Sequence, residues 1–198
     1  MTVRAATSLI SNAVKRVQTR SITIGTDMRS SAISLQKPRP WHMSDSEGSN
    51  LEADNAVSLT ELFADKTVAF FAVPAPYTGT CTHAHYPPYK KLADEIKNAG
   101  VDEIVCFAVS DPYCMNAWEK SLENDPSKIS FLTDPDISFT KAFGMDVDYS
   151  ESSLGVRSKR FSMLVVDGVV KTFRLVDAAE KDADQILEDI KEWNENTN

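Results

Sequence analysis

The chain has 198 residues, of which 42% are hydrophobic and 25% charged, and its net charge is -8 at pH 7. This length and composition fit one globular domain with a short appendage. The acidic balance argues against nucleic-acid binding, which needs a basic face. The sequence contains no run of 18 apolar residues, so we expect no transmembrane helix and no membrane partner.

The first 26 residues differ in charge from the rest of the chain. They contain four basic residues and no acidic residue, and their apolar residues recur at the spacing of an amphipathic helix. A basic, Ser-rich, acid-free amphipathic start is typical of a mitochondrial transit peptide. We therefore predict a matrix protein with a transit peptide over residues 1–26, removed near Arg20–Ile24, and a domain over residues 27–198. A plastid address, or a solvated basic tail on a cytoplasmic protein, is the alternative.

Apolar runs and helical patterns alternate through the first half of the domain. Two continuous apolar runs are typical of strands buried on both faces: residues 67–73, which are followed by Pro74, and residues 103–109. Between them, residues 86–98 have a helical pattern that stops at Gly100. The preceding polar segment is expected to form irregular structure and a short hairpin within residues 27–56.

The second half continues this alternation. The further predicted elements are, in chain order, a helix over 116–123, a strand over 129–133, a helix over 137–143, strands over 160–166 and 169–175, and a helix over 182–193. Asp167-Gly168 between the last two strands is a strong hairpin signal. This order predicts an α/β fold with a mixed central sheet and helices on both faces.

The cysteines point to chemistry rather than to a structural disulfide framework. The chain has three of them, Cys81, Cys106 and Cys114, and no Cys-x-x-Cys pair. Cys81 follows the first buried strand and precedes a helix. Unpaired N–H groups and the positive dipole end of that helix favour the thiolate, which is the reactive form. Thr78, three residues earlier, can offer its hydroxyl to the sulfur or to a substrate oxygen.

The residues around Cys81 resemble a known family. Pro74, Thr78 and Cys81 match the Pro-x-x-x-Thr/Ser-x-x-Cys motif of peroxiredoxins. Residues 81–89 are similar to the Cys-x-x-x-His-x-Pro-x-Tyr extension of the type II, atypical two-cysteine subfamily in its plant-like mitochondrial form. Segments 111–118 and 155–163 are also similar to that subfamily. One departure is Ala75-Pro76 in place of the usual Gly-Ala, which stiffens the loop.

This resemblance implies a thioredoxin-like fold and a thiol-dependent peroxidase. The expected substrates are hydrogen peroxide and organic hydroperoxides, which are reduced through a cysteine sulfenic acid. Thioredoxin, or glutaredoxin with glutathione, would regenerate the thiol. The resemblance also implies a homodimer, and we expect no cofactor and no metal. A guanidinium can stabilise both the thiolate and the peroxide oxygens, which makes Arg160 the expected partner of Cys81; Arg157 is a weaker candidate.

The second cysteine of the reaction is less well defined by the sequence. Cys106 lies 25 residues after Cys81, a placement that resembles the intramolecular resolving cysteine of plant-like type II enzymes. An external thiol and Cys114 remain alternatives, and a buried strand cysteine is commonly a small core residue. Because a disulfide needs Cα atoms about 4.4–6.8 Å apart, the helix start at Cys81 would have to unwind first.

The same residues also allow other interpretations. A zinc site on Cys81, His83 and His85 needs a fourth ligand, and His83 points away from the other two. A cysteine hydrolase needs a histidine oriented by a third group, and no histidine here has an obvious carboxylate partner. A thioredoxin-fold binding or chaperone module without peroxidase activity is the third alternative. His85 is expected to shape the loop or a dimer contact rather than to act as a base.

Overall fold

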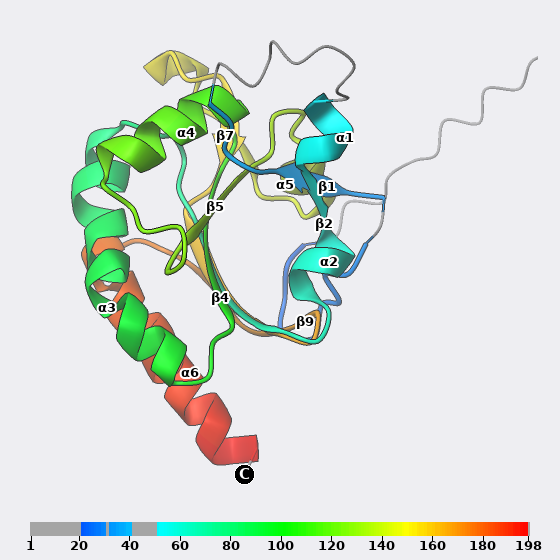
Figure 1. Ribbon diagram of the computed structural model, residues 1–198, viewed down its shortest axis with the longest axis vertical. Coiled ribbons are helices and arrows are strands. Elements are labelled where there is room, and N and C mark those ends of the chain that lie inside the picture. Colours follow the sequence, from blue (N-terminus) through cyan, green and yellow to red (C-terminus); the bar gives the residue numbers. More distant parts are fainter. Residues whose placement is uncertain (1–20, 31, 41–50, 198) are drawn as a thin grey trace, which may run out of the picture.

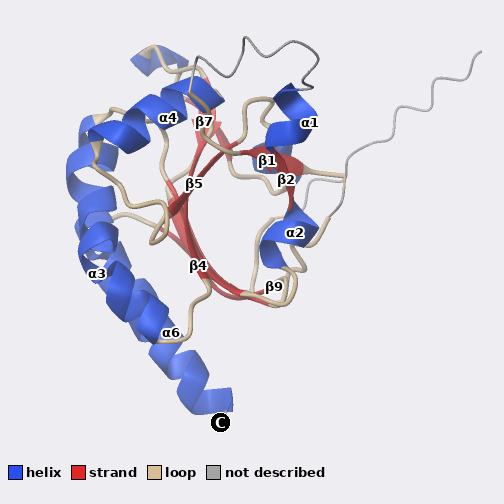
Figure 2. Ribbon diagram, viewed as in Figure 1, coloured by secondary structure: helices blue, strands red, loops and turns tan. Residues whose placement is uncertain are grey.

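The computed structural model describes residues 21–30, 32–40 and 51–197, and these form a mixed sheet with helices on both faces (Figures 1 and 2). In spatial order, the seven strands of this sheet are β2 (Ala56–Ser58), β1 (Ser34–Gln36), β5 (Ser130–Thr133), β4 (Glu103–Ala108), β3 (Thr67–Ala72), β8 (Phe161–Val166) and β9 (Val169–Leu175). A separate two-stranded sheet pairs β6 (Asp146–Asp148) with β7 (Val156–Ser158).

The centre of the sheet is parallel and its flanks are antiparallel. β3 and β5 both run parallel to β4, whereas β8 pairs antiparallel with β3 and β9 antiparallel with β8. The carboxyl ends of β3, β4 and β5 therefore lie at one edge of the sheet, where open α/β sheets carry their functional groups. The predicted thioredoxin-like α/β fold is confirmed.

Each face of the sheet has its own hydrophobic core. Figure 1 shows α3 (Tyr86–Asn98), α4 (Pro112–Ser121) and α6 (Asp182–Thr197) on one face of the sheet. The opposite face carries α1 (Leu51–Asn55), α2 (Leu59–Phe63) and α5 (Ser138–Ala142). Successive β3 residues alternate between the two, since Phe70 packs in one cluster and Phe71 in the other. The sequence of β3 is a continuous apolar run because both faces of this strand are buried.

Helix boundaries differ from the predicted ones for local reasons. α4 begins at Pro112 rather than at residue 116, because the Asp111 carboxylate accepts hydrogen bonds from the N–H groups of Tyr113 and Cys114 at 2.9 and 2.8 Å. α5 begins after Ile137, which is left-handed with φ of 57° and so lies outside the helix. α6 continues to Thr197, four residues beyond the predicted end.

The two predicted hairpins have different outcomes. Asp167 and Gly168 join β8 to β9 with φ of 43° and 74°, as a two-residue hairpin turn requires, so this prediction is confirmed. In the N-terminal region β1 and β2 do pair antiparallel, but a long connection that contains α1 joins them. The short β6 and β7 were not predicted, because three-residue strands with exposed, polar residues carry no period-two signal.

The start of the described chain packs against β9. Ile22 is buried, the Gly25 N–H donates to the Val170 carbonyl at 2.8 Å, and Asp27 bridges to Val169. Most of the predicted transit peptide, residues 1–20, lies outside the described residues. Among the residues that are described, no helix has both the length and the apolar character needed to cross a bilayer.

Candidate active site

Cys81 lies in the first turn of the helix that follows β3. The Val73 N–H still donates to the Phe107 carbonyl at 2.8 Å, so β3 keeps its pairing up to the loop. The helix starts after the loop, with the Thr82 N–H donating to the Thr78 carbonyl at 2.9 Å. Only 1% of Cys81 is exposed to solvent. The predicted position at a helix N-terminus is confirmed, and the thiol is enclosed there.

The turn that contains Cys81 is wider than an α-helical turn. It forms the π-helical segment η2 (Cys81–His85), which is continuous with α3, and the Tyr86 N–H donates to the Cys81 carbonyl. Pro87 and Pro88 explain the widening, because proline has no N–H to donate and its ring clashes with the carbonyl four residues earlier. Two adjacent prolines therefore shape the turn that presents the sulfur.

The loop before Cys81 is closed by the side chain of Thr78. Its hydroxyl donates to the Ala75 carbonyl at 2.8 Å. Because the hydroxyl proton is used in this way, the Thr78 oxygen is left as a hydrogen-bond acceptor three residues before Cys81. Ala75 is buried, and Tyr77 adopts φ of 61°, so the substituted Ala75-Pro76 segment is folded into a tight turn. Pro74 starts this turn at the end of β3.

Arg160 reaches Cys81 from the neighbouring strand. It immediately precedes Phe161, which pairs with Ala72 near the end of β3, so it lies where the loop to Cys81 leaves the sheet. Its Nη2 donates to Cys81 Sγ at 3.3 Å, and its Nη1 lies 2.9 Å from His85 Nδ1. The structure thus brings Arg160 to Cys81, whereas Pro74 and Thr78 lie in the loop that leads from β3 to the thiol.

His85 connects this cluster to the C-terminal helix. Its Nε2 lies 2.9 Å from Oδ2 of Asp182, the first residue of α6, and both side chains are fully buried. Tyr89 donates to the same Oδ2 at 2.6 Å, and Ser162 donates to Oδ1 at 2.6 Å. His85 was expected to shape the loop or a dimer contact, and in the structure it contacts Arg160, Asp182 and Tyr89. Because it has no exposed surface, it is not a surface contact of the chain.

Burial governs the charge states in this network. Burial lowers the pKa of His85 against the opposing effect of Asp182, and Arg160 lowers it further, so the imidazole is neutral at neutral pH. Burial alone would raise the pKa of Asp182, but hydrogen bonds from His85, Ser162 and Tyr89 outweigh it and lower that pKa. With a neutral imidazole, these hydrogen bonds rather than a full opposite charge hold the carboxylate.

Within the described residues, the other predicted site residues make no hydrogen bond to Cys81 or Arg160. Arg157 donates to the carbonyls of Leu154 and Val109 at 2.7 and 2.5 Å, so it anchors the approach to β8 and does not touch Arg160. Cys114 lines a cavity of about 370 Å³ together with the active-site loop. Cys106 is in the middle of β4, in the same buried cluster as Cys81, and no cysteine is bonded to another.

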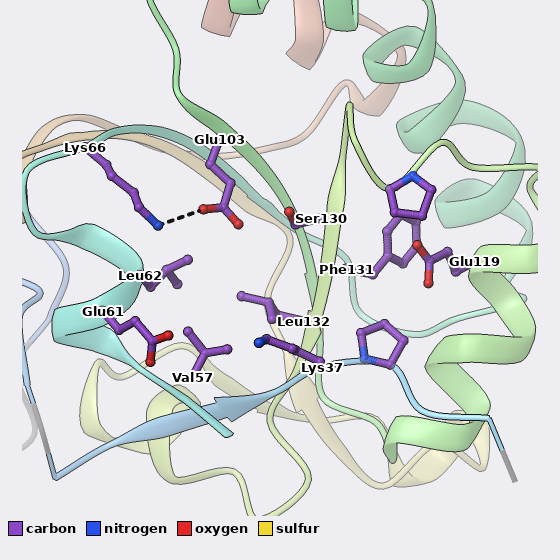
Figure 3. Close-up of a pocket in the computed structure, with 12 residues that line it drawn as sticks. Lys37, Val57, Glu61, Leu62, Lys66, Glu103, Glu119, Ser130, Phe131 and Leu132 are labelled. Carbon is purple, nitrogen blue, oxygen red and sulfur yellow. Dashed lines mark hydrogen bonds and ion pairs between the residues drawn. The ribbon is translucent and has the colours of Figure 1, made fainter. Parts of the chain in front are cut away.

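A separate cavity of about 410 Å³ lies between α2, the β1–β2 pair and β5 (Figure 3). Its lining includes Leu62, Leu132 and a Lys66–Glu103 ion pair of 3.2 Å, which Figure 3 marks with a dashed line. None of the predicted site residues lines it. Across the described residues, no three His, Cys, Asp or Glu side chains converge as a metal site would require.

Sequence reasoning missed the role of Asp182. The hydrolase interpretation assumed that no histidine has a carboxylate partner, and this was wrong, because Asp182 orients His85. The imidazole nevertheless faces Arg160 rather than the thiol, so it is not placed as the base of a hydrolase. Tyr89 had a detectable signal, four residues after His85 on one helix face. Asp182, 97 residues from His85, had none.

A thioredoxin-like sheet that presents a buried, arginine-bound thiol at a helix start defines a thiol-based oxidoreductase. The Redoxin family matches residues 44–187 of this chain. The protein belongs to the redoxin family, and within it to the peroxiredoxins. It is therefore a thiol-dependent peroxidase, which displaces the non-enzymatic binding or chaperone alternative.

Individual relatives agree in sequence and in structure. "Peroxiredoxin-2F, mitochondrial" of Oryza sativa subsp. japonica is 39% identical over 157 residues, which are 78% of this chain and 76% of that protein. Its Arabidopsis thaliana counterpart is 38% identical, with 78% and 75% covered. The reduced Prx3 of Vibrio vulnificus, solved in complex with hydrogen peroxide, superposes with a TM-score of 0.73 at 32% identity, covering 87% of this chain and 98% of that one.

The lowered pKa of His85 predicts a pH-dependent stability. The folded protein keeps the imidazole neutral where the unfolded chain, with an ordinary pKa of about 6.5, binds a proton. His85 therefore costs stability as the pH falls below about 6.5, by at most about 1.4 kcal/mol per pH unit. We expect the loss of unfolding free energy between pH 7 and pH 5, measured by urea denaturation, to be smaller in His85→Asn. Equal losses in the variant and the wild type would contradict this assignment.

Proposed function

We propose that Cys81 is the thiol that attacks the peroxide and that Arg160 stabilises this step. The observation that carries the proposal is the 3.3 Å hydrogen bond from Arg160 Nη2 to Cys81 Sγ at a thiol that is almost fully enclosed. A charge-assisted donor favours the thiolate over the thiol, and low local solvent access strengthens that interaction.

The chemistry follows from this arrangement. The Cys81 thiolate forms a bond to one peroxide oxygen while the O–O bond breaks, which gives a sulfenic acid. The leaving oxygen takes up a proton and departs as water or an alcohol. Arg160 stabilises the negative charge that develops on the leaving oxygen. The Thr78 oxygen, whose own proton is directed to Ala75, accepts a hydrogen bond from the hydroperoxide O–H and orients it.

Pro74 holds the loop in the conformation that this chemistry needs. It follows the last paired residue of β3 and starts the turn in which the Ala75 carbonyl accepts from Thr78. Proline has a fixed φ and so limits the movement of the chain between the strand and the thiol. We assign it a structural part in the site, alongside the reacting Cys81.

Replacement of the two central residues tests the assignment. Cys81→Ser should abolish peroxide consumption, whereas Cys114→Ser should retain most of it. Arg160→Ala should lose on the order of 2–4 kcal/mol of transition-state stabilisation, and Arg160→Lys should recover only part because it lacks the planar fork. Stopped-flow oxidation by hydrogen peroxide and by an organic hydroperoxide measures both effects. Substantial activity in Cys81→Ser, or a near-normal rate in Arg160→Ala, would overturn the proposal.

We further propose that Cys106 resolves the sulfenic acid within the chain. Its thiol attacks the Cys81 sulfur, a disulfide forms and water leaves. Cys106 and Cys81 belong to the same buried cluster, which supports the pairing. Burial raises the pKa of the Cys106 thiol well above its usual value, and proximity to Cys81 raises it further, so the folded state keeps it protonated. Cys106 would therefore react only after the Cys81 turn opens locally.

Local opening would break contacts that the structure identifies. The Trp118 indole donates to the Thr82 hydroxyl at 3.2 Å, and Arg160 is bonded to Cys81. The stiff Ala75-Pro76 segment adds to the resistance of the turn. A slow opening step would favour an external thiol, glutaredoxin with glutathione, as the species that reduces the sulfenic acid. Cys114 remains a third and less favoured resolving thiol.

Mass spectrometry after one equivalent of peroxide distinguishes these routes. We expect a peptide in which Cys81 is linked to Cys106. The linked peptide should be absent in Cys106→Ser and present in Cys114→Ser. A persistent sulfenic acid on Cys81, together with full turnover of Cys106→Ser on glutathione and glutaredoxin, would exclude the intramolecular route. Thioredoxin and glutaredoxin supplied in turn then identify the reductant.

We also propose that the protein is mitochondrial, in the matrix, and forms a homodimer. Two relatives named as mitochondrial support the first point, as does the basic, acid-free start of the sequence. Because Ile22 is buried and Gly25 bonds to β9, we propose that cleavage falls before Ile22, within the predicted Arg20–Ile24 window. The homodimer rests on the family resemblance, and sedimentation velocity tests it.

A reporter fusion tests the targeting segment. Residues 1–26 fused to a fluorescent protein should enter mitochondria. The same fusion with its four basic residues replaced by Gln should remain in the cytosol, since import of such peptides depends on their positive charge: Arg4, Lys15, Arg16 and Arg20. Plastid import of the unmodified fusion would contradict the proposal.

A further inference from the structure

Asp182 is a buried carboxylate that the proposed peroxide chemistry does not use. It has no exposed surface and accepts three hydrogen bonds: from His85 and Tyr89 on Oδ2 and from Ser162 on Oδ1. Removal of a carboxylate from water costs several kcal/mol unless hydrogen bonds replace the water. A core built only for stability would favour an apolar residue here, so the presence of the carboxylate calls for another explanation.

The geometry around His85 leaves one consistent arrangement of protons. An ionised carboxylate has no proton to donate, so His85 Nε2, 2.9 Å from Asp182 Oδ2, must carry the hydrogen. In the neutral imidazole the other nitrogen, Nδ1, is then an acceptor. Arg160 Nη1 can only donate, and it lies 2.9 Å from this nitrogen. The hydrogen bonds therefore run in one direction, from Arg160 to His85 to Asp182.

This chain of hydrogen bonds determines how Arg160 faces the thiol. The guanidinium is planar, so when Nη1 is bonded to His85 the position of Nη2 is set. Nη2 is the atom that donates to Cys81 Sγ at 3.3 Å. In the opposite tautomer His85 Nδ1 would carry a hydrogen directed at Arg160 Nη1. Two donors would then face each other, and Arg160 would have to turn away.

We propose that Asp182 is a positioning residue for the peroxide step: it fixes the tautomer of His85, and His85 in turn holds Arg160 against Cys81. The inference rests on the proposed roles of Cys81 and Arg160 and extends them to the start of the C-terminal helix. The hydrogen bonds and ring contacts that His85 makes with the described residues are consistent with it. They involve Asp182 from α6, Arg160 next to β8, Tyr89 from α3 and the uncharged ring of Phe71 from β3.

Asp182→Ala tests the proposal against a matched control. Without the carboxylate both tautomers of His85 are accessible, so we expect the second-order rate constant for peroxide oxidation to fall on the order of tenfold. The pH profile for reaction of Cys81 with iodoacetamide should move to higher pH, because Arg160 is no longer held at the sulfur. Ser162→Ala removes a hydrogen bond to the other oxygen of the same carboxylate. It should leave both readouts near wild type even where it lowers the melting temperature.

A double-mutant cycle separates positioning from a purely structural role. Asn in place of His85 can present an acceptor close to the position of Nδ1 but does not extend to Asp182. In the His85→Asn background, Asp182→Ala should therefore cause no further loss of rate, although it still lowers stability. An equal loss of rate in both backgrounds would mean that Asp182 acts by another route and would overturn the proposal.

Two further outcomes are decisive. If Asp182→Ala is folded and keeps the wild-type rate and pH profile, Asp182 has no positioning role. If Asp182→Ala does not fold, Asp182→Leu, which has a similar volume and no hydrogen-bond acceptor, replaces it, and a wild-type rate and profile in that variant overturn the proposal in the same way. Failure of the proposed function is recognised separately, because it appears as activity in Cys81→Ser or a normal rate in Arg160→Ala, whatever Asp182 variants do.

Discussion

The site depends on holding a positively charged guanidinium next to a thiol that water scarcely reaches. A half-buried Arg160 is stable there only because both ends of its fork have acceptors, Cys81 Sγ and His85 Nδ1. Enclosure strengthens the attraction between cation and thiolate, since less water competes for either group. The rest of the architecture brings these groups together and limits the access of water to them.

Three separate pieces of chain meet at this point. The helix after β3 carries Cys81 and His85, and the two prolines that follow widen its first turn. The antiparallel pairing of β8 with β3 brings Arg160 to the end of β3. The start of α6 supplies the carboxylate behind His85. The C-terminal helix is therefore part of the structure around Cys81 as well as a cover for one face of the sheet.

The enclosure that favours the proposed reaction with peroxide hinders the later steps of the proposed peroxidase cycle. In the proposed cycle a thiol that is 1% exposed has to react first with a small peroxide and then with a second thiol, and the second reaction requires movement of the chain. The contacts that hold the turn, among them Trp118 to Thr82, favour the first step and resist the opening that disulfide formation needs. Ala75-Pro76 lies on the same loop, so its stiffness acts on this balance rather than on the attack itself.

Much of the molecule was determined by local patterns in the sequence. Continuous apolar runs defined β3 and β4, a helical pattern ending at Gly100 defined α3, and Asp167-Gly168 defined the last hairpin, because each of these signals lies within a few neighbouring residues. The motif around Cys81 likewise made Pro74, Thr78 and the thiol candidates, and the resemblance pointed to Arg160, which the structure places 3.3 Å from Cys81 Sγ.

Only the tertiary structure decided which groups from distant parts of the chain contact these site residues. Asp182 has an ordinary acidic neighbourhood in the sequence and lies 97 residues from His85. The sequence likewise contains no signal for the long connection through α1 that joins the paired strands β1 and β2. It contains none for the left-handed Ile137, after which α5 begins. Hydrogen bonds between distant segments depend on how the sheet and helices pack, and the order of residues along the chain carries no local signal for them.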